Sequence, residues 1–108
     1  MKLLSRTDEI VMLAIWRLGD NAYGVTIREE IGAATGKNWS FGAIHVTLNR
    51  LERKGLVRSH MSGAESHRGG RSKRLFTLRP AGRELLTEMQ RLQVSMWAGI
   101  DELSLEGS

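Results

Sequence analysis

The chain contains no cysteine and no long uninterrupted apolar run, and each absence excludes a class of protein. Without cysteine there is neither a disulfide framework nor a thiolate metal site, which fits a protein of the cytoplasm. Because no run reaches about 18 apolar residues, we expect no membrane-spanning helix and no membrane partner. Asp8 and Glu9 interrupt the first apolar run, which makes it a poor signal peptide.

Signals of catalysis and of bound cofactors are also lacking. The three histidines, His45, His60 and His67, do not have the spacing of metal ligands. No glycine-rich phosphate loop follows a predicted strand. His67 lies in a stretch rich in glycine, serine and charge, which predicts a mobile loop and a poor place for catalysis. We therefore expect no enzymatic activity, no metal and no cofactor.

Length and composition predict one small globular domain. The chain has 108 residues, of which 41% are apolar and 26% are charged, and these fractions are typical of soluble globular proteins. A chain of this length builds only a modest core, so dimerisation would add stability.

Basic residues are concentrated in the middle of the chain. Residues 45–83 hold ten lysines and arginines but only two acidic residues, a charge of +8, whereas the remaining residues hold six basic and ten acidic residues, a charge of −4. The two add to the net charge of +4. This separation indicates a polyanionic partner for the middle third. The alternative is an ordinary solvated surface, which so uneven a separation disfavours.

The stretch 40–55 organises the chain and predicts a short helix with two different faces. Ser40 is placed to cap its start and Gly55 to end it. One face is apolar and comprises Phe41, Ile44, Leu48 and Leu51. The other face, with His45 on its flank, is small at its start and cationic at its end and comprises Gly42, Val46, Asn49, Arg50 and Arg53. Such a helix fits a DNA major groove, but an amphipathic surface helix explains the stretch equally well.

Two predicted helices precede this stretch. Residues 5–18 are apolar almost all round, so we expect that helix to be largely buried, partly by another subunit. Ser5 and Asp8 at its start resemble a capping box. Residues 24–35 predict a second helix that stops at Gly36 and whose inward residues are Val25, Ile27, Ile31 and Ala34. Together with the stretch 40–55, this second helix matches the spacing of a helix-turn-helix.

A small hairpin is predicted after the Gly55 stop. Residues 56–61 and 73–78 have the composition of strands, with Leu75 and Phe76 on opposite faces, and residues 62–72 form the polar loop between them. A helix-turn-helix followed by such a hairpin is a winged helix, so the predicted fold class is mainly α with a small β-wing. We assign residues 1–79 to a winged helix-turn-helix DNA-binding region.

Residues 80–108 predict a C-terminal dimerisation helix and a short tail within the same compact domain. Pro80 suits the first turn of a helix that continues to about Leu103. Its apolar residues follow heptad spacing, and the predicted dimer interface comprises Leu85, Met89, Leu92, Met96, Trp97, Ile100 and Leu103. So much apolar surface lacks a partner in a small domain, and we expect a homodimer. The alternative is that the helix folds back onto residues 5–18.

Four segments stand in a characteristic order along the chain. They are residues 21–27, NAYGVTI; residues 35–39, TGKNW; residues 41–57, FGAIHVTLNRLERKGLV; and residues 68–78, RGGRSKRLFTL, followed by Ala81 and Gly82. Together they resemble the PadR family of bacterial transcriptional regulators over nearly the whole chain, and the single C-terminal helix resembles the small subgroup of that family. Many members carry tyrosine and proline where this chain has His45 and Val46, so the resemblance does not carry over an operator sequence.

The resemblance implies a homodimeric repressor that places two copies of the helix 40–55 in successive major grooves of double-stranded DNA, about 34 Å apart, on a pseudo-palindromic operator. Gly42 allows close approach, and the candidates for base contacts are His45, Val46 and Asn49. The candidates for phosphate contacts are Ser40, Arg50 and Lys54. The wing would lie along the backbone or the minor groove with Arg68, Arg71, Lys73 and Arg74.

Members of this family often respond to small aromatic compounds, so the resemblance permits a small aromatic effector that releases the DNA. Near a two-fold axis, paired Trp97 side chains would sandwich such a flat ligand; the alternative is that Trp97 is ordinary interface packing beside Met96 and Ile100. An alternative function is a winged-helix module for protein–protein interaction without specific DNA binding, which the +8 segment disfavours.

Overall fold

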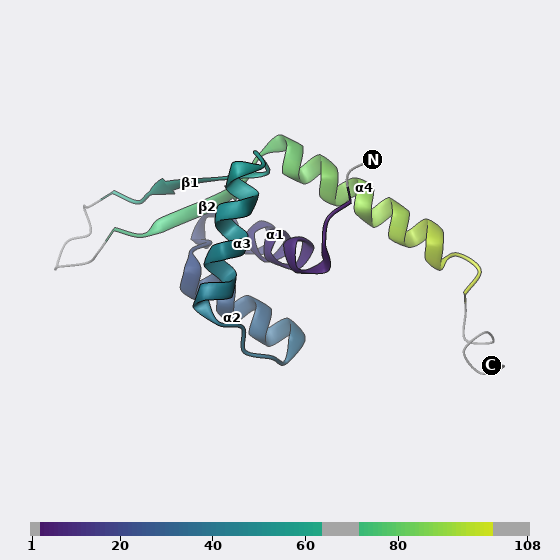
Figure 1. The fold of residues 1–108 in the computed structure, drawn as a ribbon, viewed down its shortest axis with the longest axis horizontal. Helices are drawn as coiled ribbons and strands as arrows, with labels where there is room; N and C mark the ends of the chain where they lie inside the picture. The colour runs from purple at the N-terminus through teal and green to yellow at the C-terminus, as the bar shows by residue number, and fades with distance from the viewer. Residues whose placement is uncertain (1–2, 64–71, 101–108) are drawn as a thin grey trace.

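The structure, a computed structural model, describes residues 3–63 and 72–100. Three helices form its body: α1 (Arg6–Leu18), α2 (Gly24–Thr35) and α3 (Phe41–Arg53). In Figure 1 α3 lies across the front of this body. The three helices have the predicted order and nearly the predicted bounds, which confirms the helix-turn-helix.

A hairpin and a fourth helix follow the body. A short 3-10 turn, η1 (Gly19–Asn21), joins α1 to α2, and strands β1 (Val57–Met61) and β2 (Arg74–Leu78) pair antiparallel. Helix α4 (Pro80–Trp97) comes directly after β2. Figure 1 shows the hairpin and α4 leaving the body in opposite directions. The predicted fold class, mainly α with a small β-wing, is confirmed.

The core lies where the apolar stripes of the first three helices meet the hairpin. Its largest fully buried side chains are Phe76, Met12, Ile15, Ile27, Ile31, Ile44, Leu48, Leu51, Val11 and Val57. Burying one such side chain stabilises the fold by about 1.5–3 kcal/mol. Because three of them lie on α3, the core fixes which side of α3 faces the solvent.

The hairpin is anchored to the body at its base. Its register pairs Val57 with Leu78 at the body end and Met61 with Arg74 at the outer end. The Phe76 backbone N–H also donates to the Ala22 carbonyl at 2.8 Å, which ties β2 to the segment before α2. Each strand begins one residue later than predicted, and Phe76 is buried as the strand pattern requires.

Helix α4 is shorter than predicted. It ends at Trp97, because Ala98 leaves the helical conformation with ψ 130° and Gly99 follows with a left-handed φ of 88°. Leu103, the predicted end, lies outside the described residues. The first turns of α4 pack on the body and bury Leu85 and Leu86, as the fold-back alternative required, whereas the last turns are exposed. Within the described residues no helix is long and apolar enough to cross a membrane.

Several residues predicted to lie inward are exposed. On α2 and α3 these are Val25, Ala34 and Phe41, which occupy first or last turns that extend past the core. The Phe41 ring lies under the Arg28 guanidinium, 4.6 Å from its centroid, instead of entering the core.

Helix α1 is not buried all round either. Leu13 is 42% exposed and Trp16 47% exposed, because they line open hollows, Leu13 beside α2 and α4 and Trp16 beside α4. The capping box at its start forms only in part: the Ser5 hydroxyl accepts from the Asp8 N–H at 3.1 Å, but the Asp8 carboxylate pairs with Arg50 on α3 instead.

Candidate nucleic-acid interface

The polar face of α3 is presented to the solvent because the opposite face is fixed in the core. The Ser40 hydroxyl caps the helix and accepts from the Ala43 N–H at 3.0 Å, so its hydroxyl oxygen already serves the fold. The exposed side of the helix comprises Gly42, His45, Val46, Asn49 and Arg53. Val46 is 61% exposed although it is apolar. An apolar side chain held in water at this position is available for contact with another surface, such as a thymine methyl group.

The start of α2 adjoins this face. The His45 ring lies so close to Gly24 that its Nε2 would be 3.3 Å from a Cβ at that position. The absence of a side chain at Gly24 therefore makes room for the histidine. The exposed face thus continues from α3 onto the N-terminal end of α2, where Tyr23 stands.

The C-terminal end of α3 is joined to α1 by a buried carboxylate. The Asp8 side chain is only 4% exposed and accepts a hydrogen bond from Arg50 Nη2 at 2.5 Å. Lys54 Nζ lies 3.8 Å from the second Asp8 oxygen. A buried carboxylate needs such partners because its desolvation is otherwise costly. Arg50 and Lys54, both predicted phosphate contacts, are therefore part of an internal charge cluster.

A second charge cluster joins α3 to the hairpin. Arg74 Nη2 donates to the Glu52 carboxylate at 2.5 Å, and Arg74 Nη1 donates to Asn49 Oδ1 at 3.3 Å. The Ser59 hydroxyl and backbone N–H donate to Glu52 at 2.8 Å and 3.3 Å. The hydroxyl bond from Ser59, helped by its N–H and by Arg74, lowers the pKa of Glu52 against the opposing effect of partial burial. Arg74 thus connects a predicted base contact to the wing.

The outer end of the hairpin also contacts the residue that caps α2. Lys73 Nζ stacks on the Tyr23 ring at 4.4 Å from its centroid and lies 3.4 Å from the Tyr23 hydroxyl. A cation over an aromatic face is attracted by the ring quadrupole. Arg68 and Arg71, the other two predicted wing contacts, lie outside the described residues.

The predicted dimer residues fall into two groups. Leu85 is buried in the core of its own chain, and Met89 and Leu92 are half-buried. Met96, Trp97 and Ile100 are 67%, 58% and 49% exposed. Leu103 lies outside the described residues. The exposed apolar surface is therefore at the C-terminal end of α4, away from the core.

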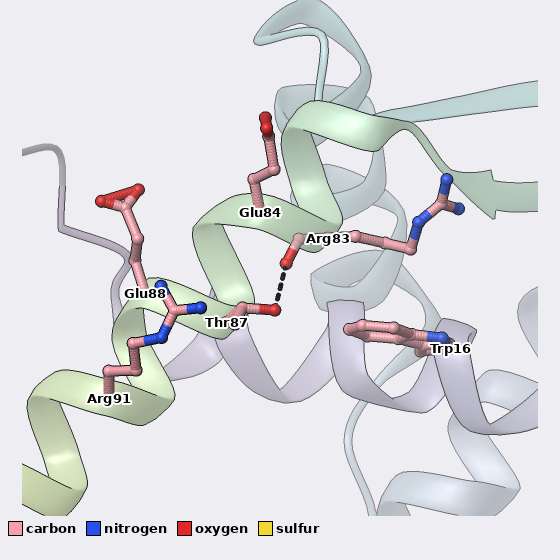
Figure 2. A pocket seen from close by; sticks show the side chains of 6 residues that line it. All are labelled: Trp16, Arg83, Glu84, Thr87, Glu88 and Arg91. Carbon is pink, nitrogen blue, oxygen red and sulfur yellow. Dashed lines mark hydrogen bonds between the residues drawn. The ribbon is translucent and has the colours of Figure 1, made fainter.

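A hollow of about 630 Å³ lies along α4 beside Trp16 of α1. Figure 2 shows its lining, in which the Trp16 ring of α1 faces α4 and the Thr87 hydroxyl donates to the Arg83 carbonyl at 2.9 Å. The remaining lining residues are of both charge signs: Glu84, Glu88 and Arg91. A lining of mixed charge does not match a polyanion, so the candidate nucleic-acid surface is that of α3 and the wing.

Three residues that hold the cations of this surface were not among the contacts predicted from the sequence. Asp8 and Glu52 hold the predicted cations, and Tyr23 holds Lys73. The sequence indicated Asp8 as part of a helix cap but not as a partner of Arg50, because Arg50 lies 42 residues away along the chain. The sequence indicated Glu52 only weakly, as one of only two acidic residues in the basic segment 45–83.

A family model described as the transcriptional regulator PadR-like family matches residues 12–88, from the middle of α1 to the middle of α4. The chain belongs to this PadR-like family. It is therefore a DNA-binding transcriptional regulator, and its family is one of regulators rather than of enzymes. No curated protein sequence matches the chain.

Solved structures of two PadR-like regulators, and of the DNA-binding protein BpsR, share the fold. The PadR-like regulator from Bacillus cereus superposes with a TM-score of 0.75 at 17% identity, over 94% of this chain and 93% of that one. A PadR family regulator from Clostridium difficile gives 0.69 at 20% identity, over 94% and 98%. BpsR of Bordetella bronchiseptica, whose DNA binding is regulated by 6-hydroxynicotinic acid, gives 0.64 at 20% identity, over 92% and 69%. At these identities the similarity establishes the fold.

Proposed function

We propose that this PadR-like regulator is a homodimeric repressor that binds a pseudo-palindromic operator. Residues 1–79 read the DNA, and residues 80–108 join the two subunits. The observation that carries the proposal is the solvent-facing side of α3, where Val46 and Asn49 are exposed beside a cationic hairpin. A second subunit would present the same face to the next major groove, about 34 Å away.

In this arrangement the side chains divide into two groups. His45, Val46 and Asn49 contact base edges, and Gly42 lets the helix backbone approach them closely. The second group contacts phosphates, which set position rather than sequence, and comprises Ser40, Arg50, Lys54, Arg68, Arg71, Lys73 and Arg74.

The end of α4 supports dimerisation. Val94, Met96 and Trp97 are 65%, 67% and 58% exposed, which is unusual for large apolar side chains so close together. A second copy of α4 would remove this surface from water, at about 25 cal/mol for each Å² covered. Because Leu85 is already buried in its own chain, the contact between subunits begins near Met89.

A small aromatic effector is the third part of the proposal. Two copies of Trp97 near a two-fold axis would form an apolar cleft for a planar ring, and BpsR is regulated by a planar ring compound, 6-hydroxynicotinic acid. We expect planar cations or phenolic compounds to quench the tryptophan fluorescence, and we expect Trp97→Ala to remove the quenching. Quenching that persists in Trp97→Ala would leave Trp97 as interface packing only.

Selection of bound sequences from a random DNA pool, repeated with candidate effectors, tests the main proposal. We expect an inverted repeat whose half-sites are separated by about one helical turn. Asn49→Ala should lose preference at one position of each half-site, by about 1–3 kcal/mol, and keep its binding to random DNA. A protein that enriches no sequence and is not retained on random DNA at low salt would contradict the proposal and favour a protein–protein interaction module.

A further inference from the structure

Most of the described cations that are predicted to contact DNA are already paired with a carboxylate of the protein. The described cations with this predicted role are Arg50, Lys54, Lys73 and Arg74. Arg50 and Arg74 each meet a carboxylate at 2.5 Å, and Lys54 shares the first of these carboxylates at 3.8 Å. Three of these four cations therefore have an internal counter-ion, Asp8 or Glu52.

Asp8 is far more buried than the cations that it pairs with, whereas Glu52 and Arg74 are exposed to about the same extent. Asp8 is 4% exposed, whereas its partners Arg50 and Lys54 are 36% and 42% exposed. The Asp8 backbone is held by the Ser5 cap, and Glu52 is held by Ser59. A phosphate approaching from the solvent would therefore reach a cation whose charge is already balanced by a fixed carboxylate.

Such pairing changes the part of DNA binding that does not depend on sequence. A cation that neutralises a phosphate releases a condensed counterion, and each such contact adds about 0.9 to the slope of log K against log salt. A carboxylate fixed next to the cation repels the same phosphate and reduces that gain. Contacts to base edges by Val46 and Asn49 are uncharged and do not lose strength in this way.

We infer that Asp8 and Glu52 are positioning residues that weaken sequence-independent DNA binding by serving as internal counter-ions for Arg50, Lys54 and Arg74. Neither carboxylate contacts the DNA itself. The consequence is a regulator that is less readily held on the many non-specific sites of a genome, where phosphate contacts supply nearly all of the affinity. The inference rests on the proposed function, because it assumes that this face meets DNA.

Asp8→Asn tests the inference because it keeps the shape of the side chain and removes its charge. We expect the affinity for a random-sequence duplex to rise by about three- to tenfold at 0.1 M salt, and the salt slope to steepen by about 0.9. The midpoint of thermal unfolding should fall at the same time, since the ion pair is lost. A purely structural role for Asp8 predicts the opposite change in DNA binding, because a loosened α3 would bind more weakly.

Glu30→Gln is the matched control. Glu30 pairs with Arg17 at 2.6 Å between α1 and α2, so its replacement removes one negative charge and one ion pair away from α3. We expect its affinity and salt slope to stay at the wild-type values. If the affinity for random DNA increased equally in Asp8→Asn and Glu30→Gln, the change in net charge alone would explain the effect, and the inference would be overturned.

Glu52→Gln provides a second, independent variant. Glu52 is 34% exposed, so the loss of its charge is better tolerated, and the result decides the matter if Asp8→Asn does not fold. Tighter and more salt-dependent binding to random DNA supports the inference, and unchanged or weaker binding by a folded variant overturns it. Failure of the proposed function is distinguishable, because wild-type protein would then bind neither random nor selected DNA at low salt.

Discussion

Gly82 of α4 lies directly against the carbonyl group of Leu56, at the junction between α3 and the wing. A Cβ at position 82 would overlap the Leu56 carbonyl oxygen and would lie 3.1 Å from Met12 Cε. The same oxygen accepts from the Arg79 N–H at 2.9 Å. α4 therefore meets the body at a point where the backbones are in contact, and this contact sets the direction in which α4 leaves.

Gly82→Ala should destabilise the protein. The added methyl group has no space, and overpacking of this kind costs about 1–3 kcal/mol, more where the obstacle is backbone. Urea unfolding measures the difference. Gly42→Ala is the matched control, because nothing lies within 4 Å of a Cβ there and the position is helical; we expect it to be neutral or stabilising by up to about 1 kcal/mol. Equal stabilities of the two variants would contradict the tight contact.

Replacement of Arg71 and Lys73 together should weaken binding to all DNA sequences and flatten the salt dependence by about two charges. The measurement is the affinity for a random duplex across a range of salt concentrations. A variant with Arg17 and Arg91 replaced loses the same charge elsewhere and should keep the wild-type slope. An unchanged slope in the Arg71 and Lys73 variant would remove the wing from the DNA contact.

Met96→Glu should convert the dimer to a monomer. The side chain is 67% exposed in the single chain, and a carboxylate there would be desolvated in the contact between two copies of α4. Sedimentation at micromolar concentration measures the change, and operator binding should fall with it. Arg91→Glu is the control: it changes the net charge on the same helix by twice as much as Met96→Glu does, and this variant should stay dimeric. A monomeric wild-type protein would contradict the proposed mode of binding altogether.

Glu52 should make the stability of the protein depend on acid pH. Its pKa is lowered in the folded state from an ordinary value of 4.5, first by the Ser59 hydroxyl. The folded state therefore holds the proton less tightly than the unfolded chain. The stabilisation that Glu52 contributes is complete above its pKa in the unfolded chain. It is lost as the pH falls from there through its pKa in the folded state. Thermal unfolding from pH 6 to pH 3 should show a smaller loss in Glu52→Gln, and parallel curves would contradict the assignment.

The outline of the fold follows from local patterns that a single chain displays. Gly36 and Gly55 end their helices as predicted, and both have left-handed φ values, 72° and 76°. Helix α4 ends early, at a turn over Ala98 and Gly99 in which Gly99 also has a left-handed φ, although the heptad spacing had suggested a longer helix. Backbone conformation at glycine is a local property, so it outweighed a periodicity whose stabilisation requires a second helix.

The candidate surface was predictable only as a set of residue types. The outward side of α3 follows from its period, because Ile44, Leu48 and Leu51 enter the core and His45, Val46 and Asn49 therefore stay exposed. The sequence did not predict which cations are paired with a carboxylate, because Asp8 and Arg50 are distant in the sequence and meet only when α1 packs on α3.

The amino-acid sequence alone therefore determined the order of helices and strands, the face of α3 that meets the solvent, and the concentration of positive charge around it. Periodicity, caps and composition act over a few residues and can be read without a structure. The tertiary structure decided which of those charges are balanced from within and where α4 points, because both depend on groups brought together from distant parts of the chain.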